Sequence, residues 1–287
     1  MHRRGGSADE CEAQRLRRIA VCADDFGLRC GINEAIVALA QAGRLTAVSC
    51  MVEAPAWGCG LPALRRLDRG GIDIGLHLDV GADAAPLALP ALILRAYSGR
   101  LDRALLRQRI EVQLTAFEQA LGRPPDFVDG HRHVHQLPLI GEALLAVLDE
   151  RYPQRRPWLR RTRAPAGRLH GLAGGKAALV AALGGHRFAE AAQRLGYPLN
   201  ARLLGVYDFH AAAAAHPRRL QQWLAQCGDG DLLMCHPALP DGTPDPIGRA
   251  RENEFAQLRG ADFAVALRQA GVALVRLSRW LAPAVAA

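Results

Sequence analysis

Four apolar runs in this sequence end in residue types that can bind a metal or move a proton. Three of the runs have the length of a buried β-strand, and the fourth, Phe127–Val128, starts a short strand. The polar sets are Asp24 with Asp25 after residues 18–23, His77 in residues 72–78, the segment Asp129–His135, and His236 after residues 231–235. Carboxylate and neutral imidazole are ligands of zinc and related metals. Together the sets predict a mononuclear site with one carboxylate and two histidines, and with positions left open for water.

The adjacent acids Asp24 and Asp25 are expected to have different roles at this site. Two neighbouring carboxylates after a strand do not face the same way, so one can bind the metal while the other turns toward a water molecule. Burying both without a cation is costly, because desolvation and mutual repulsion oppose their ionisation. The alternative is a turn or a helix cap, since Asp favours both.

The segment Asp129–His135 has histidines at alternate positions, His131, His133 and His135. In an extended strand such residues share a face, where they could bind a metal together. Asp129 could orient one of the rings by a hydrogen bond. The alternative is a polar loop that happens to be rich in histidine.

His77 and His236 are single histidines, and each has a simpler explanation. His77 could be a hydrogen-bonded core residue in its apolar strand, and His236, which precedes Pro237, could cap a turn. In a hydrolase, a histidine opposite the metal protonates a leaving amine, and a carboxylate takes the proton of the water. The four sets together therefore have the parts that an amide hydrolase needs.

The surrounding sequence alternates between strand and helix patterns. Strands are predicted at 18–23, 45–52, 72–78, 127–135, 231–235 and 272–277, and helices at 31–42, 101–121, 138–148, 216–225 and 249–259. Loops are predicted at 86–90 and 238–247, residues 205–209 are a strand or a loop, and residues 165–200 fit no pattern. The alternation indicates an α/β fold, a mostly parallel sheet with outer helices. Sites in such folds lie at the carboxyl ends of the strands, where the polar sets fall.

Length and composition favour one domain. The chain has 287 residues, of which 50% are hydrophobic, and we expect a single domain over 18–287 after a disordered extension over 1–17. No signal peptide and no transmembrane segment is predicted, which makes the cytoplasm the expected location. Seven cysteines without a CxxC pair argue against a disulfide framework and for a reducing compartment. The sequence does not indicate an oligomeric state, and a homodimer is one of the options.

The net charge of +8 comes almost entirely from arginine, since Lys176 is the single lysine. Scattered arginines and only 5% aromatic residues argue against nucleic-acid binding. One cluster stands out, which contains Arg155, Arg156, Arg160, Arg161 and Arg163. This cluster either meets an anionic group of the substrate, such as a phosphate, or forms a solvated face.

These motifs resemble, in their order, those of the YdjC-like (ChbG/HpnK) carbohydrate deacetylases over residues 18–263. The matching segments are Ala23–Leu28, Asn33 with Glu34, Gly43–Thr46, Met51–Val52, Gly75–Leu78, Asp129–His135, Cys235–Pro237, and Arg251 with Glu254–Phe255. Cys22 replaces an asparagine that is common in the family, and residues 165–200 match poorly. That middle segment is expected to help shape the substrate pocket.

The resemblance implies a distorted (β/α) barrel that removes acetyl groups from N-acetylglucosamine-type sugars or glycolipids. It also implies roles for individual residues. Asp25, His77 and His131 would bind one divalent metal, Asp24 would be the general base and His236 the general acid, while Asp129, His133, His135 and Arg163 would contact substrate or support the ligands. Zinc suits this donor set, and magnesium, manganese, iron or cobalt remain open.

Two other functions remain open at this point. The arginine cluster would favour a metal-dependent hydrolase of a different bond, such as a phosphoester. A non-catalytic protein of the same fold that binds a sugar or a lipid is the second alternative. The presence of both Asp24 and Asp25 argues against it, because a pure binder needs no base.

Overall fold

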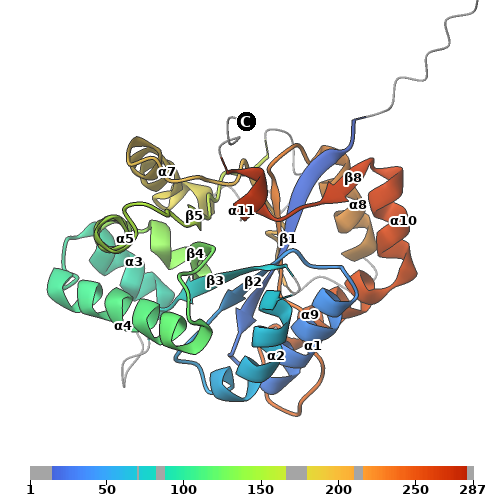
Figure 1. Cartoon of the computed structure of the whole chain (residues 1–287), viewed down its shortest axis with the longest axis horizontal. Coiled ribbons are helices and arrows are strands. Elements are labelled where there is room, and N and C mark those ends of the chain that lie inside the picture. Colours follow the sequence, from blue (N-terminus) through green and yellow to red (C-terminus); the bar gives the residue numbers. More distant parts are fainter. Residues whose placement is uncertain (1–14, 70, 82–87, 166–179, 210–215, 283–287) are drawn as a thin grey trace, which may run out of the picture.

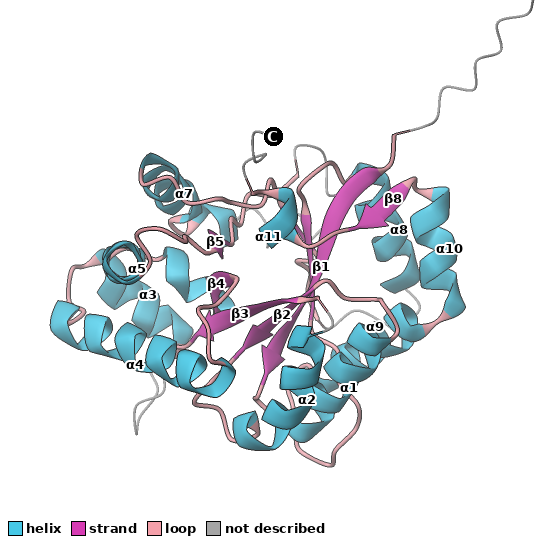
Figure 2. Cartoon of the chain, viewed as in Figure 1, coloured by secondary structure: helices cyan, strands magenta, loops and turns pink. Residues whose placement is uncertain are grey.

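The computed structural model describes residues 15–69, 71–81, 88–165, 180–209 and 216–282. In this part of the chain the strands form one eight-stranded parallel sheet with helices outside it (Figures 1 and 2). The strands are β1 (Arg17–Phe26), β2 (Ala47–Cys50), β3 (Asp73–Leu78), β4 (Phe127–Gly130), β5 (Trp158–Leu159), β6 (Leu203–Leu204), β7 (Leu232–Cys235) and β8 (Val272–Leu274).

Helices follow most of these strands and pack on the outer face of the sheet (Figure 2). They are α1 (Cys30–Gln41), α2 (Trp57–Arg69), α3 (Leu89–Tyr97), α4 (Arg103–Leu121), α5 (Ile140–Arg151), α7 (Gly185–Arg194), α8 (His216–Gln226), α9 (Gly248–Arg259), α10 (Ala261–Gln269) and α11 (Leu277–Trp280), with a 3₁₀ segment η1 (His131–Gln136). Among the described residues, none of the helices combines the length and apolar character needed to cross a bilayer.

The sheet curls until its two ends meet. Its strand order is β5-β4-β3-β2-β1-β7-β6, with β8 paired to the start of β1. Backbone hydrogen bonds then close the gap between these ends: Leu159 of β5 donates to Pro198, before β6, at 2.9 Å, and Leu203 of β6 donates to Arg163, after β5, at 2.8 Å. The predicted distorted (β/α) barrel with mostly parallel strands is confirmed.

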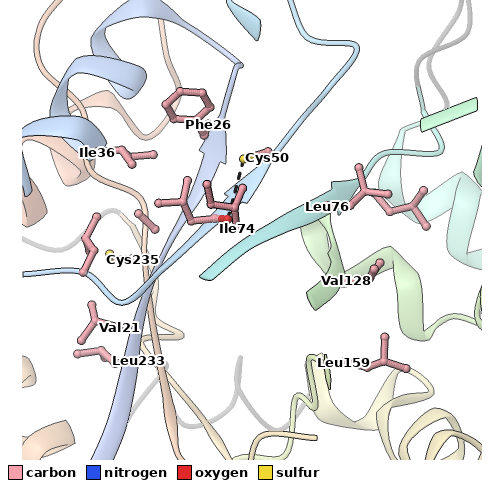
Figure 3. Packing of buried hydrophobic residues seen from close by; sticks show 14 of the residues in the cluster. Val21, Phe26, Ile36, Cys50, Ile74, Leu76, Val128, Leu159, Leu233 and Cys235 are labelled. Atoms are coloured by element: carbon pink, nitrogen blue, oxygen red, sulfur yellow. Dashed lines mark hydrogen bonds between the residues drawn. The ribbon is translucent and has the colours of Figure 1, made fainter. Parts of the chain in front are cut away.

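Side chains along each strand alternate between the barrel interior and the outer helices, as expected for buried strands. The interior cluster includes Ala20, Cys22, Ala47, Phe127, Trp158, Leu203, Leu232 and Met234. The outer cluster includes their neighbours Val21, Val48, Val128, Leu159, Leu233 and Cys235, most of them visible in Figure 3. Gly75 of β3 has no room for a side chain, because a Cβ there would lie 2.5 Å from the Phe127 ring.

Most predicted elements are present, with shifted ends. The extension expected over 1–17 falls mainly outside the described residues, and Arg17 is already the first residue of β1, paired with Val272. The loop expected at 86–90 lies partly outside them as well, and its last residues, Leu89 and Pro90, begin α3. The strand expected at 272–277 ends at Leu274, and residues 205–209 form a loop.

Candidate metal centre and active site

The barrel interior changes from apolar to polar at the carboxyl ends of the strands. On β1, β2, β4 and β7 the last apolar side chain that faces inward is followed, two residues later, by a polar side chain on the same face. On β3 the polar side chain comes two residues after Gly75. The polar residues are Asp24 on β1, Ser49 on β2, His77 on β3, Asp129 on β4, and His236 directly after β7. Five distant segments of sequence therefore meet at one end of the barrel, and they include the four that the sequence predicts for a parallel sheet.

Asp25 and two histidines form a group that could hold a metal ion. The Oδ1 atom of Asp25 lies 3.1 Å from Nδ1 of His131 and 3.3 Å from Nε2 of His77. One potential ligand atom of each of the three residues lies within 4.8 Å of the others. The structure thus brings together the three residues that the sequence assigns to the metal.

A bulge in β1 allows Asp24 and Asp25 to serve one site. The register with β2 shifts between Ala23 and Phe26, and Asp25 has a left-handed backbone (φ 69°). Asp tolerates this conformation better than most residues, and such strain occurs at functional sites. Both acids line the same cavity. Their carboxylates have different partners, since Asp24 binds Arg160 whereas Asp25 faces the two histidines, and the bulge accommodates both arrangements.

Asp129 forms a hydrogen bond with the His77 ring nitrogen that is not directed at Asp25. Its Oδ1 atom lies 2.6 Å from Nδ1 of His77 and accepts a hydrogen bond from Ser49 Oγ at 2.5 Å. Burial alone would lower the pKa of His77, but Asp129 and the other nearby carboxylates raise it to about 10. The surroundings of His77 therefore stabilise a positive charge, which a metal ion would supply.

Arg160 is a central residue that the sequence did not reveal. It is fully buried and binds both oxygens of Asp24, each at 2.6 Å, and Oδ2 of Asp129 at 2.5 Å. Burial raises the pKa of Asp24, but Arg160 outweighs it and holds that pKa well below its usual value. For Arg160, both expectations for the arginine cluster, a substrate contact and a solvated face, are wrong.

The charges at the centre fit a bound cation. Three buried carboxylates, those of Asp24, Asp25 and Asp129, face the two guanidinium groups of Arg160 and Arg251. The three negative charges of this set exceed its two positive charges by one, beside the nitrogens of the two ligand histidines. A divalent ion between one carboxylate and two imidazoles would compensate it.

The histidine-rich segment is not the extended strand that its alternation predicts. β4 ends at Gly130, and His131 begins the 3₁₀ segment η1, in which Arg132 and His133 have left-handed backbones (φ 53° and 61°). The rings consequently separate. His131 joins Asp25, His133 lines the cavity without binding in that group, and His135 is buried with Nε2 at 3.0 Å from the carbonyl oxygen of Arg160.

His236 lines the same cavity as the metal group. Its Nε2 atom is 3.9 Å from Oδ2 of Asp24, and burial lowers its pKa. Its backbone N–H donates to Glu254 of α9, which also accepts a hydrogen bond of 2.7 Å from the Tyr207 hydroxyl. The position of His236 is therefore fixed by the helix that carries the Arg251–Glu254 motif.

The cavity above these residues has a volume of about 470 Å³. Its polar lining consists mainly of Asp24, Asp25, His77, His131, His133, His236, Asp245 and Arg251, and its apolar lining includes Leu28, Val206, Phe209 and Ile247. Arg163 is exposed and is not among the lining residues, while Arg155 and Arg156 line a different cavity. The arginine cluster therefore gives no support to a phosphate group at this site.

Comparison with known proteins links the geometry to one family. The family model described as "YdjC-like protein" matches residues 18–269. The human "Carbohydrate deacetylase" is 34% identical over 150 residues, which cover 45% of this chain and 46% of the relative. The "Chitooligosaccharide deacetylase" of Serratia marcescens is 33% identical over 136 residues, which cover 42% of this chain and 52% of the relative. The matches thus span about half the length of these curated relatives.

One solved structure shares the fold closely. It comes from Enterococcus faecalis V583 and is described as a candidate cellobiose-phosphate cleavage protein. The comparison has a TM-score of 0.66 at 18% identity and covers 93% of this chain and all of the other. At this identity the likeness concerns the fold alone, and it agrees with the barrel described above.

Proposed function

The chain belongs to the YdjC-like family, and from this premise we propose that it is a metal-dependent hydrolase that removes the acetyl group of an N-acetylated sugar or glycolipid. The observation that carries the proposal is the meeting of Asp25, His77 and His131 with Asp24 and His236 in one cavity. Relatives named carbohydrate deacetylase and chitooligosaccharide deacetylase support the same chemistry.

Asp25, His77 and His131 would hold one divalent ion, and zinc fits the site because one carboxylate and two imidazoles match its preferred donors. When bound, such an ion lowers the pKa of a water molecule toward about 7 and polarises a carbonyl group. The hydrogen bond from His77 to Asp129 would fix the ring and its tautomer, as metal-binding histidines require.

Asp24 would take the proton of the water that attacks the acetyl carbon. Arg160 keeps its carboxylate ionised at neutral pH and fixed in orientation, so the base is ready before substrate binds. His236 would then protonate the departing sugar nitrogen. Because burial lowers its pKa, its protonated form gives up a proton more readily than an exposed imidazolium does, and Asp24 lies 3.9 Å away as a source of the proton.

An assay of product release tests this proposal against the phosphoester alternative. Purified protein loaded with Zn²⁺, Mn²⁺ or Co²⁺ is incubated with N-acetylated chitooligosaccharides and glycolipids, and with phosphorylated sugars in parallel. We expect acetate release that a chelator abolishes and added metal restores. Phosphate release without acetate release would refute the proposed bond specificity, and binding without turnover of any substrate would favour a non-catalytic protein.

A further inference from the structure

Arg251 and Glu254 lie one turn apart on α9, and each holds a different residue of the proposed centre. Glu254 accepts the backbone N–H of His236, and Arg251 donates from Nη2 to Oδ2 of Asp25 at 2.7 Å. Arg251 is only 4% exposed. The proposed reaction gives this arginine no task, although it contacts a residue assigned to the metal.

The two oxygens of Asp25 have different partners. Oδ1 faces the nitrogens of His77 and His131, whereas Oδ2 is occupied by Arg251. A carboxylate can bind a metal through one oxygen or through both, and the second mode uses an additional coordination position. Oδ2 is thus engaged by a guanidinium group, whose positive charge repels a second cation, and Oδ1 is the oxygen that faces the two histidines.

The guanidinium group is itself held in place. Nε of Arg251 donates to Oδ2 of Asp245 at 2.8 Å, and the same oxygen accepts a hydrogen bond of 2.6 Å from Arg29. Arg29 directly precedes α1, so two helices and the loop that carries Asp245 converge on this contact. The hydrogen bond to Asp245, which Arg29 in turn holds, keeps the buried guanidinium group of Arg251 directed at Asp25.

We propose that Arg251 is a positioning residue that restricts Asp25 to one metal-binding oxygen and thereby keeps a coordination position free for the substrate. This inference rests on the proposed metal-dependent function. The positive charge of Arg251 also weakens Asp25 as a donor, so the site gives up some metal affinity. Removal of Arg251 should therefore tighten metal binding while it slows the reaction, whereas loss of a merely structural residue would weaken both.

The test uses Co²⁺ as the probe in wild-type protein and in the variants Arg251→Met, Arg251→Lys and Arg249→Met. Affinity is measured by competition with a chelator, and coordination by visible absorption, which weakens as the coordination number rises. For Arg251→Met we expect Co²⁺ to bind about tenfold tighter, with weaker absorption and a kcat at least about tenfold lower. Arg251→Lys retains the charge and should recover much of the wild-type affinity.

Arg249→Met is the matched control, since Arg249 lies on the same helix and is exposed. Its affinity, spectrum and kcat should equal those of the wild type. Unchanged Co²⁺ affinity and absorption in Arg251→Met would overturn the inference, and so would weaker binding, which indicates a structural role. If the wild-type protein itself binds no Co²⁺, the proposed metal-dependent function fails, and that result is distinct from any effect of Arg251.

Discussion

Single side chains balance the charge at the proposed centre. Arg160 pairs with Asp24 and Asp129 together, and it holds the pKa of Asp24 well below its usual value in a site from which water is largely excluded. A buried ion pair of this kind is expensive to break, because the remaining partner is left charged and unpaired. The base of the proposed reaction is thus supported by a residue that is itself neither one of the proposed metal ligands nor among the residues that line the cavity.

The Asp24→Asn variant tests the assignment of the general base. We expect kcat to fall by at least about 100-fold while metal content stays at the wild-type level, because general bases contribute on this scale and Asp25 is untouched. Activity is measured as acetate release and metal content by elemental analysis. The exposed residue Asp262 on α10 provides the control Asp262→Asn. Wild-type turnover in Asp24→Asn would show that another group takes the proton.

Short connections between elements determine which histidine reaches the metal group. The chain turns sharply after β4, and a Cβ at Gly130 would lie 2.8 Å from the backbone nitrogen of His135. A side chain at this position would push η1 away from β4 and carry His131 with it. The glycine before His131 is therefore part of the site, although it offers no functional group.

We expect Gly130→Ala to destabilise the protein by about 2 kcal/mol, the scale of an overpacked core, and to weaken metal binding. Urea unfolding and a chelator competition measure the two effects. Gly58→Ala on α2 is the control: its Cβ meets nothing within 4 Å, and it should be neutral or slightly stabilising. Equal stability of the two variants would mean that the turn can relax and that Gly130 is not required.

Helices α1 and α2 carry a pair of cysteines close enough to react. The sulfur atoms of Cys30 and Cys59 lie 3.4 Å apart, and both residues are exposed. A low-molecular-weight disulfide such as oxidised glutathione should convert the two thiols into one intramolecular disulfide and be reduced to two thiols. The Cys59 thiol raises the pKa of Cys30, so the reaction should be faster at alkaline pH.

Mass spectrometry after alkylation measures this crosslink, which appears as the loss of two hydrogens and two alkylation sites. Cys30→Ser should abolish it, whereas Cys227→Ser, which alters a buried thiol, should not. Recovery of both cysteines fully alkylated after oxidation at alkaline pH would contradict the prediction.

The barrel as a whole depends on the contact between its two sheet ends. Asn200 is fully buried there: it accepts the N–H of Arg161 at 2.7 Å and donates to the carbonyl oxygens of Arg161 and Arg202. Arg161, which Asn200 holds, directly follows Arg160 at the end of β5. Closure of the barrel therefore also positions Arg160, the partner of Asp24. Stability and the geometry of the site are consequently linked.

Asn200→Ala should lower the free energy of unfolding by about 3 kcal/mol, since it leaves buried backbone groups without partners. Unfolding in urea measures this change. The control is Asn253→Ala on α9, a half-buried helical position at which alanine is well tolerated. A similar stability of both variants would indicate that other contacts close the barrel.

The sequence by itself determined the fold class and the main candidates for the site. Apolar runs that end in Asp25, His77 and His236 predicted parallel strands with polar carboxyl ends, because strand length and hydrophobic periodicity are local properties. The same pattern predicted the position of Asp24, which lines the cavity together with these residues. For these residues, the position relative to a strand was sufficient.

Only the tertiary structure decided the contacts that depend on distant segments or on unusual backbone conformations. Arg160 looked like one arginine among several, and its two carboxylate partners lie 136 residues before it and 31 residues before it in the chain. The left-handed residues Asp25 and His133 break the alternation from which faces were inferred. Local patterns record how a segment buries its apolar side, but they do not record which charges meet once the barrel has closed.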